Sequence, residues 1–86
     1  MDFSEALMYV KDGKKVQRSG WNGKNMWIRY FDPSLDHESD IVVGGPYSEG
    51  LLWLPFIIMK TVDNKLVPWL ASQTDILAVD WQVVSE

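Results

Sequence analysis

The chain has 86 residues, no cysteine and a net charge of −4 at pH 7, and 47% of its residues are hydrophobic. This composition predicts one folded domain over residues 1–86 and excludes disulfides, thiol chemistry and a cysteine zinc site. The acidic balance disfavours nucleic-acid binding, although residues 11–29 carry six basic side chains and only one acidic. The longest apolar run, residues 51–59, is too short to span a membrane, so we expect no membrane partner.

The chain is unusually rich in tryptophan, with five in 86 residues. A domain of this size buries only about 60–65% of its unfolded surface, and each indole can bury roughly 150–250 Å². Trp27 falls within a predicted strand and is expected in the core. We expect some of the other indoles in a ligand pocket or a subunit interface, because oligomerisation is a common source of extra burial for small domains.

Residues 2–11 are predicted to form an amphipathic helix. Asp2 and Glu5 have the spacing of a capping box, and the apolar residues that follow recur at intervals of three and four. Gly13 suits the position just after a helix C-cap. We expect this helix to cover one face of a sheet.

Strands are predicted at residues 15–18 and 26–31. Between them Asn22-Gly23 is a strong signal for a two-residue hairpin turn. Trp21 stands at the tip of this turn, where no core is expected. Its indole would then be a stacking platform or an interface anchor, with ordinary packing as the alternative.

Residues 32–50 carry few signals for regular structure, apart from a possible strand at residues 41–43. A metal site is conceivable here, but a calcium loop started at Asp32 or Asp36 lacks the required Gly and Glu. A solvated acidic loop without metal is the favoured interpretation. The side chains that crowd this loop are Asp32, Asp36, His37, Glu38 and Asp40.

Residues 51–60 are predicted to contain two strands, separated at Pro55. The second, residues 56–59, is continuously apolar, which is typical of a strand covered on both faces. We expect the helix on one face and a second subunit on the other. A turn at residues 63–64 then leads into a strand at residues 65–67.

The C-terminal part changes character several times. Pro68 cannot donate to a sheet ladder, so its strand ends there or lies at an edge. Ser72 followed by Asp75 has the spacing of a helix cap and predicts a short helix near residues 72–78. Its polar N-terminus suits a polar ligand, with a plain connector as the alternative. A strand at residues 81–84 closes the sheet.

These elements predict an α+β fold. It consists of an N-terminal helix packed on a twisted antiparallel sheet of about five strands, with a short second helix near residues 72–78. The catalytic inventory is small: His37 is the only histidine, and no nucleophile or phosphate-binding motif occurs. Asp75 and Asp80 could act as acid and base, but helix capping explains the former equally well. We therefore expect no enzyme, with a small nucleotide hydrolase as an alternative.

Several segments together resemble the small viral Thoeris anti-defence proteins of the second class. The longest reads Val-Pro-Trp-Leu-Ala-Ser-Gln-Thr-Asp-Ile-Leu-Ala-Val-Asp-Trp. The likeness covers both ends of the chain and does not extend through residues 32–53. The matching segments are residues 2–7, 13–18, 20–24, 59–61 and 67–81.

The resemblance implies an oligomeric sponge, typically a homotetramer, with pockets between subunits. It would bind glyco-cyclic ADP-ribose, a signal made by a bacterial TIR-domain enzyme, in the cytoplasm of the infected host, without a cofactor and without cleaving the ligand. One departure is Phe56, because the family often has a His before the Met-Lys pair. The implied ligand-binding residues are Trp21, Asn22, Trp69, Ser72, Gln73, Thr74 and Asp75. The rival is a phage structural or protein-interaction module with no nucleotide ligand.

Overall fold

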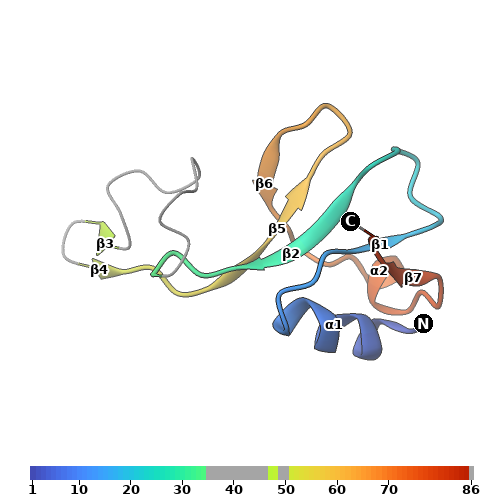
Figure 1. The fold of residues 1–86 in the computed structure, drawn as a ribbon, viewed down its shortest axis with the longest axis horizontal. Helices are drawn as coiled ribbons and strands as arrows, with labels where there is room; N and C mark the ends of the chain where they lie inside the picture. The colour runs from blue at the N-terminus through green and yellow to red at the C-terminus, as the bar shows by residue number, and fades with distance from the viewer. Residues whose placement is uncertain (35–46, 49–50, 86) are drawn as a thin grey trace.

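The computed structural model describes residues 1–34, 47–48 and 51–85. It has the predicted α+β architecture: helix α1 (Phe3–Lys11), a five-stranded antiparallel sheet in the order β6-β5-β2-β1-β7, and a short helix α2 (Gln73–Ile76) (Figure 1). The predicted strand at residues 41–43 and most of the acidic loop lie outside the described residues. The strands are β1 (Val16–Arg18), β2 (Trp27–Phe31), β5 (Phe56–Lys60), β6 (Leu66–Pro68) and β7 (Trp81–Val83), with a separate pair β3 (Tyr47–Ser48) and β4 (Leu51–Leu52).

Helix α1 begins and ends as its local sequence predicts. The Glu5 backbone N–H donates to Asp2 Oδ1 at 2.9 Å, so Asp2 is the N-cap. Gly13 follows the C-cap with a φ of 89°, a conformation that glycine adopts without a steric penalty. Ala6 and Val10 are fully buried and point the apolar stripe of the helix at the sheet.

The two faces of the sheet differ in character. Val16 pairs directly with Ile28, and both are buried with Trp81 beneath α1. Because side chains alternate along a strand, Gln17 and Trp27 project from the opposite face. Helix α1 packs mainly on β1, β2 and β7. β5 is separated from β1 by β2, and its residues Ile57 and Met59 pack against the core cluster that includes Ala6 and Val10 of the helix (Figure 1).

The connection between β1 and β2 is longer than predicted. The Val16–Ile28 register places residues 19–26 outside the ladder, so Asn22-Gly23 is not a two-residue hairpin turn. Instead the chain leaves β1 held to the segment before β7, because the Ser19 N–H donates to the Asp80 carbonyl at 3.1 Å. Because of this tertiary hydrogen bond, the chain continues alongside the segment before β7 and does not reverse direction in a tight turn.

The β5–β6 hairpin and its edge position agree with prediction. Asn64 has a φ of 63°, and the Thr61 side chain accepts a hydrogen bond from the Lys65 N–H at 3.0 Å. Pro68 ends β6, which is an edge strand of the sheet. Edge placement tolerates its missing N–H group.

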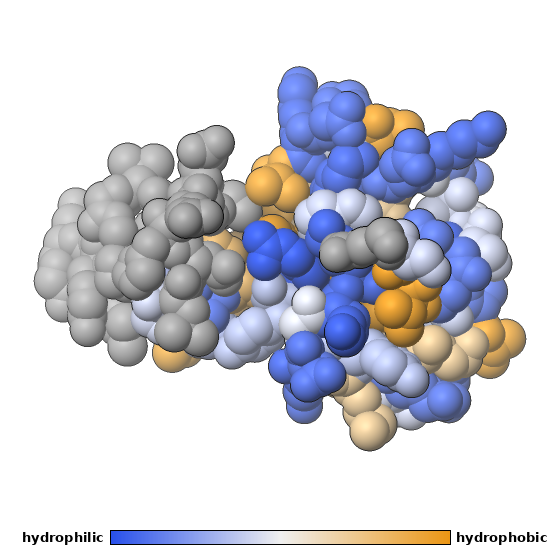
Figure 2. All heavy atoms as spheres, in the orientation of Figure 1, coloured by the Kyte–Doolittle hydropathy of each residue, from blue (hydrophilic) through white to orange (hydrophobic). Residues whose placement is uncertain are grey.

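Hydrophilic side chains cover much of the visible face of the described region, with smaller hydrophobic patches between them (Figure 2). None of the described helices combines the length and the apolar character needed to cross a membrane.

Candidate functional site

An aromatic cluster brings together two of the predicted ligand residues. Its centre is Trp81, which is 2% exposed. The Trp21 ring lies 5.3 Å from it in an edge-on arrangement, and the Trp69 ring lies 6.1 Å away, also edge-on. Phe3 from α1 contacts both Trp69 and Trp81. Trp21 and Trp69 are therefore near neighbours, both half-buried and both packed on the same indole.

The structure corrects the predicted setting of Trp21. This residue is not an isolated indole at a turn tip, because it packs on the main core through Trp81. Its Nε1 also donates to Asp75 Oδ1 at 3.1 Å. Part of the Trp21 side chain thus packs against the core, as the alternative of ordinary packing predicts. Because the residue is only half-buried, another part of its ring is exposed to solvent.

Asp75 is the hub that connects α2 to the rest of the molecule. Its Oδ1 accepts hydrogen bonds from Trp21 and, at 2.7 Å, from Arg18 Nη1. Its backbone N–H donates to the N-cap Ser72 Oγ at 3.1 Å. Its carbonyl oxygen accepts from Trp81 Nε1 at 2.9 Å. A four-residue helix has little intrinsic stability, so these contacts hold it in place.

Arg18 joins Asp75 to a second carboxylate. Its Nε donates to Asp80 Oδ1 at 2.8 Å, and Asp80 Oδ2 accepts the Gly20 N–H at 2.8 Å. The side chains of Arg18, Asp75 and Asp80 are 19%, 14% and 29% exposed. One guanidinium therefore holds two largely covered carboxylates, the charge-assisted geometry in which arginine is most effective.

The ionisation states follow from these contacts. Partial burial acts to raise the pKa of Asp75, but hydrogen bonds from Arg18, Trp21 and Ser72 outweigh it, and the pKa lies below its ordinary value. The hydrogen bond from Arg18 is the main cause of the lowered pKa of Asp80. The two carboxylates in turn raise the pKa of Arg18. Both aspartates are thus ionised near neutral pH, and neither is poised as a general acid.

The remaining predicted residues lie at the start of α2 or in the β1–β2 connection. Ser72 is confirmed as the N-cap, and its Oγ lies 2.9 Å from Thr74 Oγ1. Gln73 and Thr74 are exposed at this helix end, and Asn22 is exposed beside Trp21 in sequence. The helix itself spans Gln73–Ile76 and is shorter than predicted.

The comparisons with known proteins decide the family. A model of the Thoeris anti-defense 2-like domain matches residues 1–84. The chain belongs to this family. It is similar to a protein named Thoeris anti-defense 2 from Bacillus phage SP01, with 46% identity over 86 residues that cover 99% of this chain and 96% of the relative. The resemblance seen in the sequence is confirmed, and it supports a phage anti-defence role.

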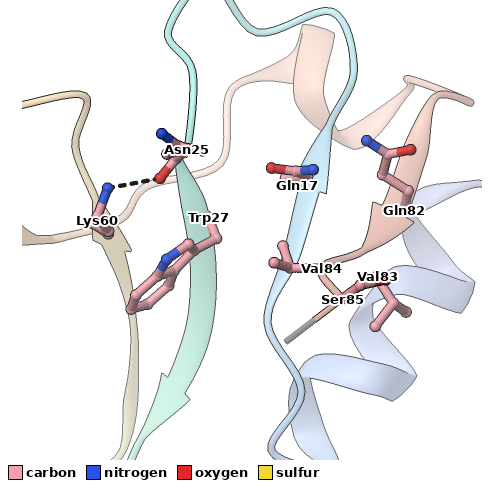
Figure 3. Close-up of a pocket in the computed structure, with 8 residues that line it drawn as sticks. All are labelled: Gln17, Asn25, Trp27, Lys60, Gln82, Val83, Val84 and Ser85. Atoms are coloured by element: carbon pink, nitrogen blue, oxygen red, sulfur yellow. Dashed lines mark hydrogen bonds between the residues drawn. The ribbon is translucent and has the colours of Figure 1, made fainter.

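This Thoeris anti-defense 2-like chain also has an open hollow of about 500 Å³ on the sheet face opposite α1 (Figure 3). Trp27 lies at one side with the Lys15 ammonium 4.6 Å from its ring, and Lys60 Nζ donates to the Asn25 carbonyl at 2.8 Å. Trp27 is only half-buried, so the expectation that it belongs to the core is wrong. None of the seven predicted ligand residues is among those lining the hollow: Gln17, Asn25, Trp27, Lys60, Gln82, Val83, Val84 and Ser85.

Sequence reasoning overlooked two residues that organise the aromatic cluster in this family member. The sequence places Trp81 in the closing strand and Arg18 in a strand and a basic stretch, both within segments that resemble the family, but it gives neither residue a role at the site. Arg18 is separated from Asp80 by 62 positions and from Asp75 by 57. No local spacing rule reaches that far, so these pairs had no signal in a single sequence.

Proposed function

We propose that the protein is a non-catalytic sponge that binds glyco-cyclic ADP-ribose and blocks Thoeris immunity in the cytoplasm of the infected host. The observation that carries this proposal is the aromatic cluster beside the polar start of α2, in a chain of the Thoeris anti-defense 2-like family. Sequestration needs tight, reversible binding and no reacting group.

The chemistry of the cluster suits a nucleotide. The half-buried rings of Trp21 and Trp69 offer surfaces on which a base can stack. The exposed side chains of Gln73 and Thr74 can hydrogen-bond ribose hydroxyls or base edges. A ligand of about 35 heavy atoms that gains roughly 0.3 kcal/mol per atom would bind with about 10 kcal/mol, or tens of nanomolar affinity.

We also propose that the pocket is completed by a second subunit, within a homotetramer. Aliphatic side chains near α2 support this: Leu70, Leu77 and Val79 are 92%, 77% and 77% exposed. Such a concentration of exposed aliphatic groups favours a protein contact. The same observation favours the rival function, a protein-interaction module without a nucleotide ligand.

Equilibrium filtration and heat release distinguish these functions. The protein is incubated with glyco-cyclic ADP-ribose, the unbound ligand is filtered away, and the retained fraction is heated and analysed by chromatography. A sponge depletes the filtrate and releases unchanged ligand on heating. A linear product would indicate the hydrolase, and an undepleted filtrate would favour the interaction module. Native mass spectrometry of the same mixture reports the oligomer and any bound mass together.

Two exposed glutamines provide a matched pair of variants. Gln73 lies at the predicted site, and Gln82 lies by the hollow on the opposite face. Since a neutral hydrogen bond contributes about 0.5–1.5 kcal/mol, Gln73→Ala should weaken binding by about 2- to 12-fold. Gln82→Ala should bind like the unmodified protein. Equal affinities for the unmodified protein and both variants would mean that the pocket does not lie at α2.

A further inference from the structure

The contacts of Asp75 point to a role different from direct ligand binding. Its Oδ1 already accepts two hydrogen bonds within the chain, from Arg18 and from the Trp21 indole N–H. The side chain is 14% exposed, so most of it is turned away from any ligand arriving from solvent. The atoms of Asp75 that are committed to the fold include its backbone N–H and carbonyl oxygen.

The same network holds Trp21 at two points. Asp75 fixes the N–H edge of the indole, and Asp80 fixes the backbone next to it through the Gly20 N–H. Arg18 bridges the two carboxylates. The Trp21 ring also packs edge-on against Trp81, with an interplanar angle of 82°. The plane of the indole is thereby set by contacts made within one chain.

We propose that Asp75 and Arg18 are positioning residues that fix the Trp21 indole for stacking, and that Asp75 itself makes no bond to the ligand. This inference rests on the proposed function, because it assigns how the predicted nucleotide site is built. Preorganisation of a stacking surface improves affinity, since the side chain loses no further rotamer freedom on binding. The indole N–H is consumed by Asp75, so Trp21 offers the ligand its ring surface only.

A double-mutant cycle separates positioning from direct contact. Trp21→Phe keeps an aromatic ring but removes the N–H group that Asp75 accepts. If Asp75 acts through Trp21, Asp75→Ala should weaken binding of glyco-cyclic ADP-ribose by about tenfold in the unmodified chain and less than about twofold beside Trp21→Phe. If Asp75 contacts the ligand, for example through Oδ2, the loss should be equal in both backgrounds, and the proposal is overturned.

Fluorine NMR on protein labelled with 5-fluorotryptophan tests the positioning without any ligand. The signal missing from Trp21→Phe identifies Trp21. Asp75→Ala, or Asp75→Asn if the alanine variant folds poorly, should shift or broaden that signal. An unchanged Trp21 signal in a folded variant would contradict the inference. If the unmodified protein fails to bind the nucleotide, the proposed function fails, and the NMR result still decides whether Asp75 fixes Trp21.

Discussion

Replacement of Trp81 by Phe tests the central claim about the fold, that one indole organises the aromatic cluster. Trp81 is 2% exposed, and its Nε1 donates to the Asp75 carbonyl oxygen at 2.9 Å. Phenylalanine keeps an apolar ring but removes the indole donor, and because the carbonyl still accepts the Ala78 N–H at 3.3 Å, the loss is that of one hydrogen bond, about 0.5–1.5 kcal/mol. The net loss of three buried ring atoms costs about 1.5–2.5 kcal/mol more.

The expected loss for Trp81→Phe is therefore about 2–4 kcal/mol. In a domain of this size each kcal/mol lowers Tm by about 4–8 °C, so the melting temperature should fall by roughly 10–30 °C. Trp27→Phe is the matched control: it is also a strand tryptophan, but it is half-buried on the open face beneath the Lys15 ammonium. Its loss should stay below about 1 kcal/mol, the size of an exposed cation–π contact.

Thermal unfolding followed by circular dichroism at pH 7, at one fixed protein concentration, measures both changes. A large fall for Trp81→Phe with a small one for Trp27→Phe supports the placement of the two indoles on opposite faces. Equal falls would refute the reasoning, because they would mean that burial beneath α1 and the indole hydrogen bond contribute nothing particular at Trp81.

Three further predictions concern the network around α2. The pKa of Asp75 is lowered on folding, so its ionised form stabilises the fold above about pH 4, and this stabilisation is lost below it. The Tm of Asp75→Asn should therefore fall less than that of the unmodified protein between roughly pH 5 and 3. Ser72→Ala removes the N-cap of α2 and should cost about 1 kcal/mol in urea unfolding. Gly20→Ala should lower Tm, because a Cβ at Gly20 would lie 2.7 Å from Asp80 Oδ2. A crystal structure of this variant should show the Asp80 side chain displaced, whereas Gly13→Ala should retain the Asp80 contacts.

The sequence by itself determined the elements whose signals are local. The N-cap Asp2 and its partner Glu5 are three residues apart, as are Ser72 and Asp75, and both caps formed as predicted. Pro68 predicts an edge strand because proline itself has no backbone N–H to donate to a neighbouring strand. Such interactions depend on a few neighbouring dihedral angles, so the sequence alone is enough to place them.

The residues that this chain shares with the family could likewise be recognised from the sequence alone, because the resemblance rests on residue identity at both ends of the chain. That resemblance named Trp21, Trp69 and Asp75 together, and the fold brings these three around Trp81. Whether they bind a nucleotide stays a prediction. Their proximity is a property of the chain that the structure describes.

Only the tertiary structure decided the register and the partners of the charged groups. Asn22-Gly23 is a good hairpin turn in isolation, yet the hydrogen bond from Ser19 to Asp80 carries the chain elsewhere. Trp21 bonds Asp75 across 54 positions of sequence. Contacts of this kind form only after the sheet has brought β1 and β7 side by side, and their geometry depends on packing that no spacing rule encodes.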